Sequence, residues 1–438
     1  MAFGFVHLSD IHFGQEGETG ALDVNKDARE RLIDDVKSVV TQLAAGKAAG
    51  IIVTGDIAYS GTEKEYDDAS AWLDRLAKAA GCPITEIQVV PGNHDIDRDK
   101  ITPAVQRAID DIVEKGQPAL DAYMADPDSR KLLFKRFDAF LPFAEGYRCP
   151  LDTSGQLAEE RVVKLAEGRM IRFVRLNSAL ACSSKDKEGK LILGQRQHVL
   201  GERSGEELVV LIHHPIHWLQ DSEESMRYIR SRARVVISGH EHNPAVRVET
   251  VEEGCQLMML AAGATVPPHA GEKYTYCYNV IELDWDEASD SLSVRILPRA
   301  WNNERKRFEA DDKRLQGNEP NFLLASPKFR SAPRAPSYTP QPTSTPSPAE
   351  SIAIEAPSAV SVPVEGQDAP DSYSLMVLRF FRDLSPNERL KILIKMGILP
   401  AGFVGDLYES FERQSFDQLI RGGRGQELSQ ELQGLLAK

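Results

Sequence analysis

The sequence predicts a layered α/β fold followed by a small all-helical unit. Through residues 1–325, short apolar runs of strand length alternate with amphipathic segments of helical period. A Pro-rich stretch then sets apart residues 371–438, whose apolar side chains recur with helical spacing. With 438 residues, of which 42% are hydrophobic, the chain is long enough for two to three globular domains.

The predicted strands of residues 1–325 are short and apolar, as buried strands are. They are Phe3–Leu8, Ile51–Thr54, Ile87–Val90, Met170–Leu176, Leu208–Ile212, Val235–Ser238, Leu257–Ala262, Tyr278–Leu283 and Leu292–Leu297. Helical periodicity predicts helices over Asp27–Ala45 and Lys64–Ala79. A further helical segment, Pro103–Phe143, is far longer than the usual connection of about four to six residues, so we expect it to form a cap.

Residues 326–370 contain ten prolines mixed with Ser, Thr and Ala. Such a composition buries too little apolar surface to offset the entropy cost of ordering, which predicts a disordered linker. The expected organisation is therefore a large α/β domain over 1–325, a disordered linker over 326–370 and a small helical domain over 371–438.

Composition also limits the compartment and the partners. The chain has 52 basic and 66 acidic residues, and its net charge of -14 disfavours broad binding to nucleic acid. No apolar run approaches the roughly 18 to 20 residues of a transmembrane helix. The start lacks the basic region of a signal peptide, and the five cysteines show no zinc-like or disulfide-framework spacing. We expect a cytoplasmic protein without a membrane span.

Five polar clusters each follow a predicted strand, and together they hold six of the ten histidines. The clusters are Asp10-Ile11-His12, Gly55-Asp56, Gly92-Asn93-His94-Asp95, His213-His214-Pro215 and Gly239-His240-Glu241-His242. Ligands of open α/β sheets gather at the carboxyl ends of strands, so the clusters predict one shared site.

The donor types in these clusters predict a metal centre. Seven side chains offer nitrogen or oxygen donors and none offers a thiolate: Asp10, His12, Asp56, Asn93, His213, His240 and His242. Residues two apart in an extended segment point the same way, so the DxH pair and the HxH pair can each hold one ion. The set exceeds what one tetrahedral zinc ion uses and suits two divalent transition-metal ions, chosen from Mn, Fe, Co, Ni and Zn.

In this order, the motifs DxH, GD, GNHD, HHP and GHxH resemble those of the calcineurin-like metallophosphoesterases, over about residues 1–300. The resemblance implies a four-layer sandwich of two mixed sheets flanked by helices. It also implies that Asp56 bridges the two ions. The other ligands would be Asp10, His12 and His242 at the first metal and Asn93, His213 and His240 at the second.

The same resemblance implies roles for two further residues. His94 would act beside the phosphate as general acid or transition-state stabiliser, and Asp95 would orient its ring. His214 is expected behind the ligands rather than among them. The histidines outside the motifs are expected to be structural or surface residues: His7, His198, His217 and His269.

Two adjacent metal ions can polarise a phosphate ester and lower the pKa of a water molecule between them. Within the family, sequences that combine GNHD, HHP and GHxH resemble cyclic-nucleotide and related diesterases. We therefore expect hydrolysis of a small phosphodiester by a metal-bridging hydroxide. A metal-dependent nuclease and a phosphomonoesterase are the alternatives, although the acidic residues 1–325 offer no stripe for duplex binding.

Residues 371–438 are expected to form four helices, over Tyr373–Asp383, after Ser385, over Phe403–Gln414 and over Gln426–Leu435. Ser385-Pro386-Asn387-Glu388 is a capping box with proline at the first helical position, and Gly397 would end that helix. The segment LSPNERLKILIKMGIL resembles the death-like, effector-associated adaptor domains of bacterial conflict systems. This implies a protein partner that recruits the enzyme, as in phage defence. The alternatives are a self-association module and a scaffold protein without catalysis.

Overall fold

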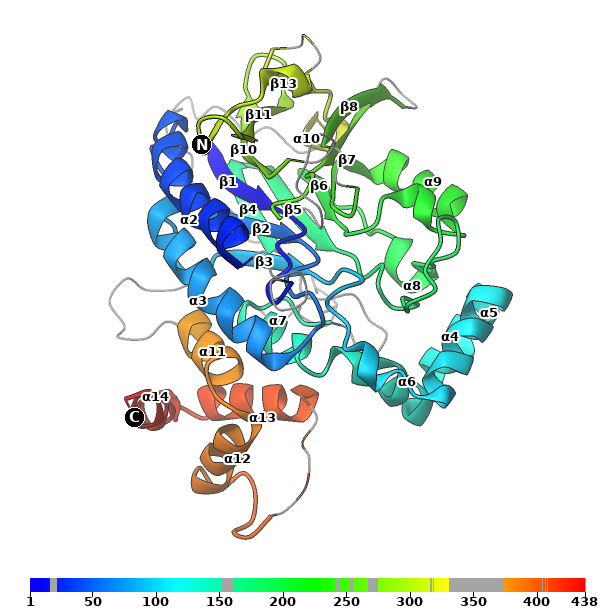
Figure 1. The fold of residues 1–438 in the computed structure, drawn as a ribbon, viewed down its shortest axis with the longest axis vertical. Coiled ribbons are helices and arrows are strands. Elements are labelled where there is room, and N and C mark those ends of the chain that lie inside the picture. Colours follow the sequence, from blue (N-terminus) through cyan, green and yellow to red (C-terminus); the bar gives the residue numbers. More distant parts are fainter. Residues whose placement is uncertain are drawn as a thin grey trace, which may run out of the picture.

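The computed structural model describes residues 1–15, 22–151, 161–241, 244–251, 255–266, 275–315, 317, 319–330, 373–403, 405, 407 and 409–437. His242, His269 and the predicted linker beyond Arg330 lie outside these residues. The described chain forms a two-sheet sandwich with helices around it and a separate helical bundle (Figure 1). None of the described helices is long and apolar enough to cross a membrane.

The first sheet contains seven described strands, in the order β12-β11-β10-β1-β2-β3, with β13 paired to β11. The strands are β1 Phe3–Leu8, β2 Gly50–Thr54, β3 Ile87–Val90, β10 Cys277–Asp286, β11 Ser291–Asn302, β12 Arg307–Ala310 and β13 Asn321–Leu324. β1, β2 and β3 run parallel, and β10 is antiparallel to β1. β2 and β3 are buried along their whole length, which explains their continuous apolar sequences.

The second sheet contains six described strands, in the order β4-β5-β6-β7-β9-β8. The strands are β4 Arg161–Ala166, β5 Arg169–Arg175, β6 Glu206–Leu211, β7 Ala233–Ser238, β8 Ala245–Thr250 and β9 Gln256–Ala261. The four central strands are parallel, whereas the edge strands β4 and β8 are antiparallel to their neighbours.

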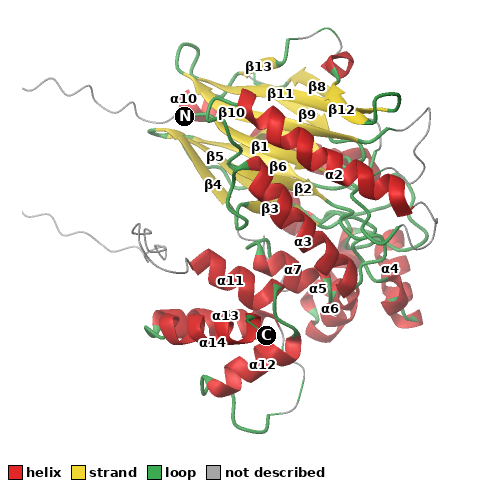
Figure 2. Ribbon diagram, turned by 60° about the vertical axis from the view of Figure 1, so that its left-hand side comes forward, coloured by secondary structure: helices red, strands yellow, loops and turns green. Residues whose placement is uncertain are grey.

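Apolar side chains from both sheets fill the space between them, as Phe5 and Phe173 show with ring centroids 5.2 Å apart. Helices α2 (Leu22–Val39) and α3 (Glu63–Ala80) cover the first sheet (Figure 2), and α9 (Ser222–Arg232) packs against β7 of the second (Figure 1). The short α8 (Gln195–His198) lies beside α9. The predicted four-layer sandwich is thus confirmed.

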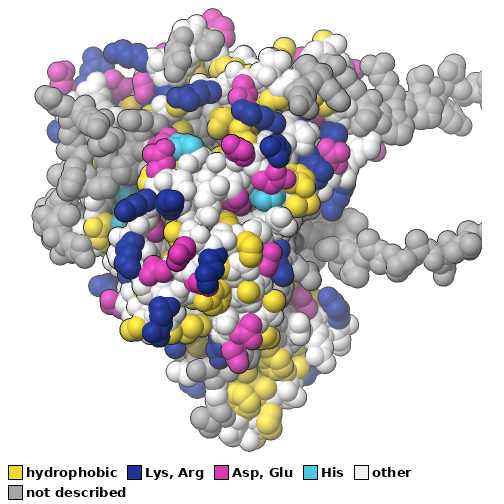
Figure 3. All heavy atoms as spheres, turned by 90° about the vertical axis from the view of Figure 1, so that its right-hand side faces the viewer, with side chains coloured by type: hydrophobic (Ala, Val, Ile, Leu, Met, Phe, Trp, Pro, Cys, Tyr) yellow, Lys and Arg dark blue, Asp and Glu magenta, His cyan; other side chains and the backbone are white. Residues whose placement is uncertain are grey.

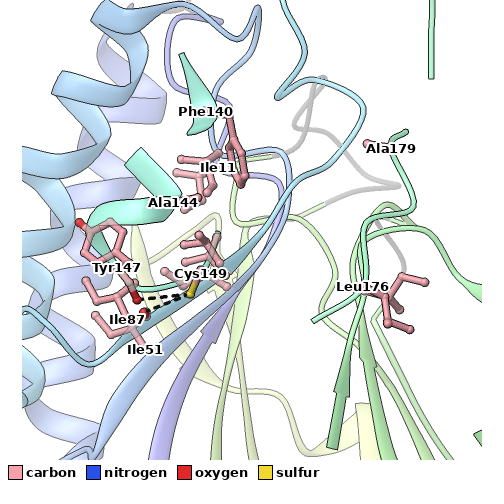
Figure 4. Packing of buried hydrophobic residues seen from close by; sticks show 14 of the residues in the cluster. Ile11, Ile51, Ile87, Phe140, Ala144, Tyr147, Cys149, Leu176 and Ala179 are labelled. Atoms are coloured by element: carbon pink, nitrogen blue, oxygen red, sulfur yellow. Dashed lines mark hydrogen bonds between the residues drawn. The ribbon is translucent and has the colours of Figure 1, made fainter. Parts of the chain in front are cut away.

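The insertion after β3 folds into four helices, which we call the helical cap: α4 Pro103–Lys115, α5 Gln117–Ala125, α6 Pro127–Phe134 and α7 Phe140–Gly146. The side chain of Asp126 accepts a hydrogen bond from Ser129 N, which starts α6 after the chain has turned. Figure 4 shows Phe140 and Ala144 of α7 beside Ile11, so the last helix of the cap rests on the sandwich.

Helices α11 (Tyr373–Arg382), α12 (Pro386–Lys395), α13 (Glu409–Arg421) and α14 (Gly425–Leu436) form the C-terminal bundle. It has a hydrophobic core of its own, with Phe380, Leu393 and Phe416 fully buried. The capping box of Ser385 and Glu388 is present, and Gly397 follows α12 with a positive φ of 69°. The third helix starts at Glu409, six residues after the predicted start at Phe403.

A short helix, α10 (Pro327–Arg330), lies within the stretch that the sequence assigns to the linker. Ser326 and Phe329 are fully buried, and Phe329 belongs to the core between the two sheets. The ordered fold of the first domain therefore continues to Arg330.

Candidate metal centre

The polar clusters converge at one edge of the sandwich. Asp10 follows β1, Asp56 follows β2 and Asn93 follows β3 in the first sheet, while His213 follows β6 and His240 follows β7 in the second. These strands are parallel within each sheet, so their carboxyl ends lie together. Backbone hydrogen bonds tie the loops to one another, such as His12 N donating to Asp56 O over 3.0 Å.

The backbone at this edge is strained. Among the described residues, seven non-glycine residues have a positive φ, and four of them are Asp10, His12, Asp56 and His240. Their φ values lie between 52° and 64°, in the left-handed region that side chains with a Cβ disfavour. Such strain persists where the surrounding structure enforces it, and it concentrates at functional sites.

Gly92 is required by a close approach rather than by its own conformation. A Cβ atom at this position would lie 2.1 Å from Asp56 Oδ1. Without it, His94 N comes close enough to donate a hydrogen bond to that oxygen over 2.8 Å.

Asp56 lies at the middle of the cluster, and its buried carboxylate is shared by several groups. Its Oδ2 is 3.4 Å from His12 Nε2 and 3.3 Å from His213 Nε2. His213 Nε2 is in turn 3.2 Å from Asn93 Oδ1. Ligand atoms of Asp10, Asp56 and His213 all lie within 4.8 Å of one another, and the same holds for His12, Asp56 and His94.

The hydrogen bonds of the imidazoles fix which nitrogen faces the centre. Nδ1 of His12 donates to Val266 O over 3.0 Å, and Nδ1 of His213 donates to Thr54 O over 2.7 Å. A carbonyl oxygen only accepts, so Nδ1 carries the proton and the Nε2 lone pair of the neutral ring is left for a metal. His240 N donates to Asp10 Oδ2 over 3.2 Å, which brings the fifth loop against the first.

The electrostatics of the cluster favour a cation. Burial alone would raise the pKa of Asp56, but His213, His94 and His12 outweigh burial and hold it well below its usual value. Burial alone would lower the pKa of His213, but Asp56 and Asp10 raise it to about 9. Ionised carboxylates at this buried site therefore favour a bound cation. Asp56 belongs both to the group with His12 and His94 and to the group with Asp10 and His213.

His94 lies at the open side of the site. Asn93, His94 and His240 are half-buried, whereas Asp10, His12, Asp56 and His213 are buried. Nδ1 of His94 donates to Tyr59 O over 2.7 Å, and the Tyr59 ring stacks on the imidazole at 5.0 Å. Burial lowers the pKa of His94 despite the opposing charge of Asp56.

Asp95 has a different environment from the one that the resemblance implies. Tyr59 O, not Asp95, binds the ring of His94. The Asp95 carboxylate instead accepts hydrogen bonds from Gly92 N at 2.9 Å, Ala58 N at 3.0 Å and Ile57 N at 3.1 Å. It therefore joins the loop of Asp56 to the loop of Asn93 and His94.

Two other side chains support the histidines, and no motif indicated them. Ser178 Oγ lies 2.8 Å from His214 Nδ1, which holds that ring beside His213 and His240. The Trp218 ring meets the His240 ring edge-on at 4.2 Å. Tyr59 and Trp218 are each three residues from a motif, and this short separation was a weak indication that they lie near the site. Ser178 is distant from every motif and gave none.

Seven of the nine predicted site residues thus lie in one cluster with donors directed at a common space: Asp10, His12, Asp56, Asn93, His94, His213 and His240. Asp95 lies just behind it, and His242 is outside the described residues. Neutral imidazole nitrogens, carboxylates and an amide oxygen are the donors that divalent transition metals accept, so the residues present fit such ions.

Residues 3–244 match the family model of the calcineurin-like phosphoesterases, over more than half of the chain. The chain belongs to the calcineurin-like phosphoesterase family. This family uses divalent metal ions, in agreement with the clustered donors. Membership also supports a hydrolase acting on phosphate esters.

A curated relative in this family is the uncharacterized metallophosphoesterase-like protein YydB of Bacillus subtilis strain 168. It is 23% identical over 339 residues, which are 74% of this chain and 65% of the relative. The chain thus spans less than two thirds of that protein's length.

Solved phosphoesterase-like structures resemble the chain only distantly. The NAD nucleotidase of Haemophilus influenzae is 10% identical with a TM-score of 0.34, covering 72% of this chain and 55% of that one. The 5'-nucleotidase of Candida albicans is 10% identical with a TM-score of 0.32, covering 75% and 56%. TM-scores this low support no conclusion about activity.

Residues 372–433, which include most of the C-terminal bundle, match the model of the GTPase-associated adaptor domain. The expected adaptor character of this segment is therefore confirmed, and the phosphoesterase carries an adaptor domain at its C-terminal side.

Proposed function

We propose that this phosphoesterase holds two divalent metal ions and hydrolyses a small phosphodiester. The observation that supports this is the sharing of the Asp56 carboxylate: Nε2 of His12 and Nε2 of His213 both approach its Oδ2, at 3.4 and 3.3 Å. A carboxylate with nitrogen donors from two different loops suits a bridging position between two ions. Asp10, His12 and His242 would complete one ion's ligand set, and Asn93, His213 and His240 the other's.

When bound, the two ions would supply Lewis acidity at the phosphate and lower the pKa of a water molecule. The chain's own residues would do the rest. Asn93, His94 and His240 lie at the open side, where an ester can enter. Because Nδ1 of His94 donates to Tyr59 O, Nε2 is the nitrogen that would face the leaving oxygen, and it would give a proton there from the doubly protonated ring. Stacking on Tyr59 keeps the ring in that orientation.

A small substrate agrees with the surface. On the face drawn in Figure 3, Lys and Arg side chains are interspersed with Asp and Glu side chains rather than gathered into a stripe. Together with the net charge of -14, this favours a nucleotide-sized diester over a nucleic acid duplex.

The test is hydrolysis of bis-p-nitrophenyl phosphate by the full chain with added Mn²⁺. We expect turnover that Asp56→Asn reduces by about a thousandfold or more, since the substitution removes the shared charge. Preference for p-nitrophenyl phosphate would instead indicate a monoesterase. Retained activity in Asp56→Asn would contradict the bridging assignment.

A substrate panel and a metal analysis complete the test. Cyclic nucleotides, dinucleotides, glycerophosphodiesters and single-stranded DNA separate a small-diester enzyme from a nuclease. A pure scaffold would hold fewer than two equivalents of transition metal after dialysis against Mn²⁺, whereas the proposed centre retains two.

We further propose that the C-terminal bundle brings the enzyme to a protein partner. Because the matched family is described as a GTPase-associated adaptor domain, the proposed partner belongs to a GTPase system. The full chain as bait is compared with a chain that lacks residues 373–438. A GTPase-system protein retained by the full chain alone supports recruitment, and equal retention by both contradicts it.

A further inference from the structure

The C-terminal bundle is docked on the phosphoesterase domain, beside α7 and α3 (Figure 2). Arg382, at the end of α11, is 5% exposed, and its two terminal nitrogens lie 2.7 and 3.0 Å from the two carboxylate oxygens of Asp74 on α3. It also donates to Tyr147 OH over 2.9 Å. A second ion pair joins Arg413 of α13 to Glu145 of α7.

Apolar contact accompanies these ion pairs. Leu378 of α11 is fully buried and belongs to the core of the phosphoesterase domain rather than to that of the bundle. Gly146 lets α11 approach: a Cβ atom there would lie 2.8 Å from Arg382 Cβ and 3.4 Å from a Leu378 methyl carbon. The docked position is therefore defined by specific groups on both sides.

A continuous set of contacts runs from this interface to the metal centre. The Phe143 ring of α7 lies 5.1 Å from the Tyr147 ring on one side and 4.9 Å from the Tyr66 ring on the other. The centroid of the Phe140 ring also lies 5.9 Å from that of the Tyr66 ring. Tyr66 lies on α3, the same helix that presents Asp74 to Arg382.

Tyr66 is the last step before the metal-binding loops. It is 3% exposed, and its hydroxyl donates to Asp95 Oδ1 over 3.0 Å. The same carboxylate receives Ile57 N, next to Asp56, and Gly92 N, next to Asn93. A shift of Tyr66 would therefore loosen the group that holds two ligand-bearing loops together.

We propose that docking of the C-terminal bundle positions the metal-binding loops through Tyr66 and Asp95, so that docking and metal binding strengthen each other. The idea rests on the proposed two-metal function. Tyr66 is then a positioning residue, and the bundle is a switch: a partner that removes it from α7 weakens the metal centre. Linkage requires the reverse effect as well, because metal binding must favour the docked state by the same factor.

The test uses full-length variants and a charge exchange. Arg382→Asp and Asp74→Arg each place like charges together, and the double variant restores an opposite pair. Gly146→Leu blocks docking sterically and independently of charge. Lys395→Asp reverses an exposed charge on α12 that pairs with Glu431 of α14 and not with the phosphoesterase domain, and it serves as the matched control.

Docking is read as the radius of gyration from small-angle X-ray scattering, and Mn²⁺ binding as the dissociation constant from calorimetry without substrate. We expect the single interface variants to be expanded and to bind Mn²⁺ about fivefold more weakly or worse, the lower range of allosteric coupling. The charge exchange and Lys395→Asp should match the wild type. Added Mn²⁺ should shift a partly undocked variant toward the compact form.

Tyr66→Phe then tests the route, since it keeps the ring contacts and removes the hydroxyl. In this background, Arg382→Asp should expand the chain without any additional loss of Mn²⁺ affinity. Expanded variants that bind Mn²⁺ with wild-type affinity would overturn the proposal. So would an Arg382→Asp substitution that lowers Mn²⁺ affinity as much in the Tyr66→Phe background as in the wild type. Variants that all stay compact would overturn it too, because coupling needs two states. Wild-type protein that binds Mn²⁺ but hydrolyses no ester would contradict the proposed function alone.

Discussion

Nitrogen atoms that face the metal centre owe their orientation to backbone carbonyls elsewhere in the chain. His12 depends on Val266, which is 254 residues away, and His213 depends on Thr54. These candidate ligands are thus oriented by the packing of the whole sandwich rather than by their own loops. We expect metal affinity to respond to disturbances of that packing that touch no ligand.

His94 can be separated from the ligands by experiment. His94→Gln keeps an amide near the phosphate but cannot transfer a proton, so kcat should fall by about a hundredfold to ten-thousandfold. The number of bound Mn²⁺ ions, measured by mass spectrometry of the metal, should stay the same. Loss of an ion in His94→Gln would show that this residue is a ligand instead.

His7 should make stability depend on pH. It is fully buried, its Nε2 lies 3.0 Å from Thr54 Oγ1, and burial lowers its pKa to about 3. The folded-state pKa lies below the unfolded value of about 6.5, so this contribution to stability is present above pH 6.5 and is lost as the pH falls.

Between pH 7 and 5, that loss amounts to about 2 kcal/mol of unfolding free energy. Urea titrations of the wild type and of His7→Gln at both pH values measure this loss. Subtracting the change seen in His7→Gln from that of the wild type removes the contributions of all other titrating groups. An equal loss in both proteins would show that His7 does not titrate in this range.

Single residues of the site were predictable where a motif fixed their type and spacing. Asp10, Asp56, Asn93 and His213 could be assigned to one cluster because each stands in a short motif directly after a predicted strand. Tyr66 could not, since its role depends on a hydroxyl that reaches Asp95 across 29 residues and its ring looks like any other core residue of an amphipathic helix.

Among the elements, α12 is the one whose start the sequence specifies most completely. Ser385 N and Oγ both donate to Glu388 Oε2, at 2.9 and 2.7 Å, and Pro386 takes the first helical position. The local signal and the final structure agree there because every group involved lies within four residues.

Ser385→Ala should lower the unfolding free energy of the bundle by about 1 kcal/mol, because the helix loses its side-chain cap. Ser385→Asp keeps an acceptor and should lose much less. Chemical denaturation followed by a probe in the bundle measures both, and equal losses would mean that the cap contributes little.

The strands that the sequence did not predict share one property, exposure at a sheet margin. β4 and β8 are edge strands of the second sheet, and each has a single buried residue among its six. β12 and β13 are four residues long. α9 was missed as well, because its sequence SEESMRYIRSR buries only Ser225 and Ile229. Pattern reasoning detects burial, and these elements have little of it.

At the scale of the whole molecule, metal binding should raise stability. A ligand that binds only the folded state at a hundred times its dissociation constant contributes about 2.7 kcal/mol. We expect Mn²⁺ to raise Tm by several degrees over a sample with chelator, and Asp56→Asn to abolish the shift. The same rise in Asp56→Asn would place the bound ion elsewhere.

The organisation into a sandwich and a bundle was predictable, whereas their docking was not. Composition separates the two parts, since prolines crowd the stretch between them. Docking depends on Gly146 and Arg382, which are separated by more than two hundred residues and belong to no motif. In the sequence alone, a glycine at a helix end and an arginine in an amphipathic helix are common and do not indicate a contact between two domains.

The left-handed backbone at Asp10, His12, Asp56 and His240 narrows the substitutions that the chain can tolerate there. Asparagine and glycine enter this conformation readily, whereas valine or isoleucine would be refused by main-chain sterics before any chemistry is considered. Substitutions that preserve the backbone at these four positions are therefore expected to be Asn or Gly. The same two residues are the ones to choose for variants that remove the carboxylate or imidazole and keep the fold.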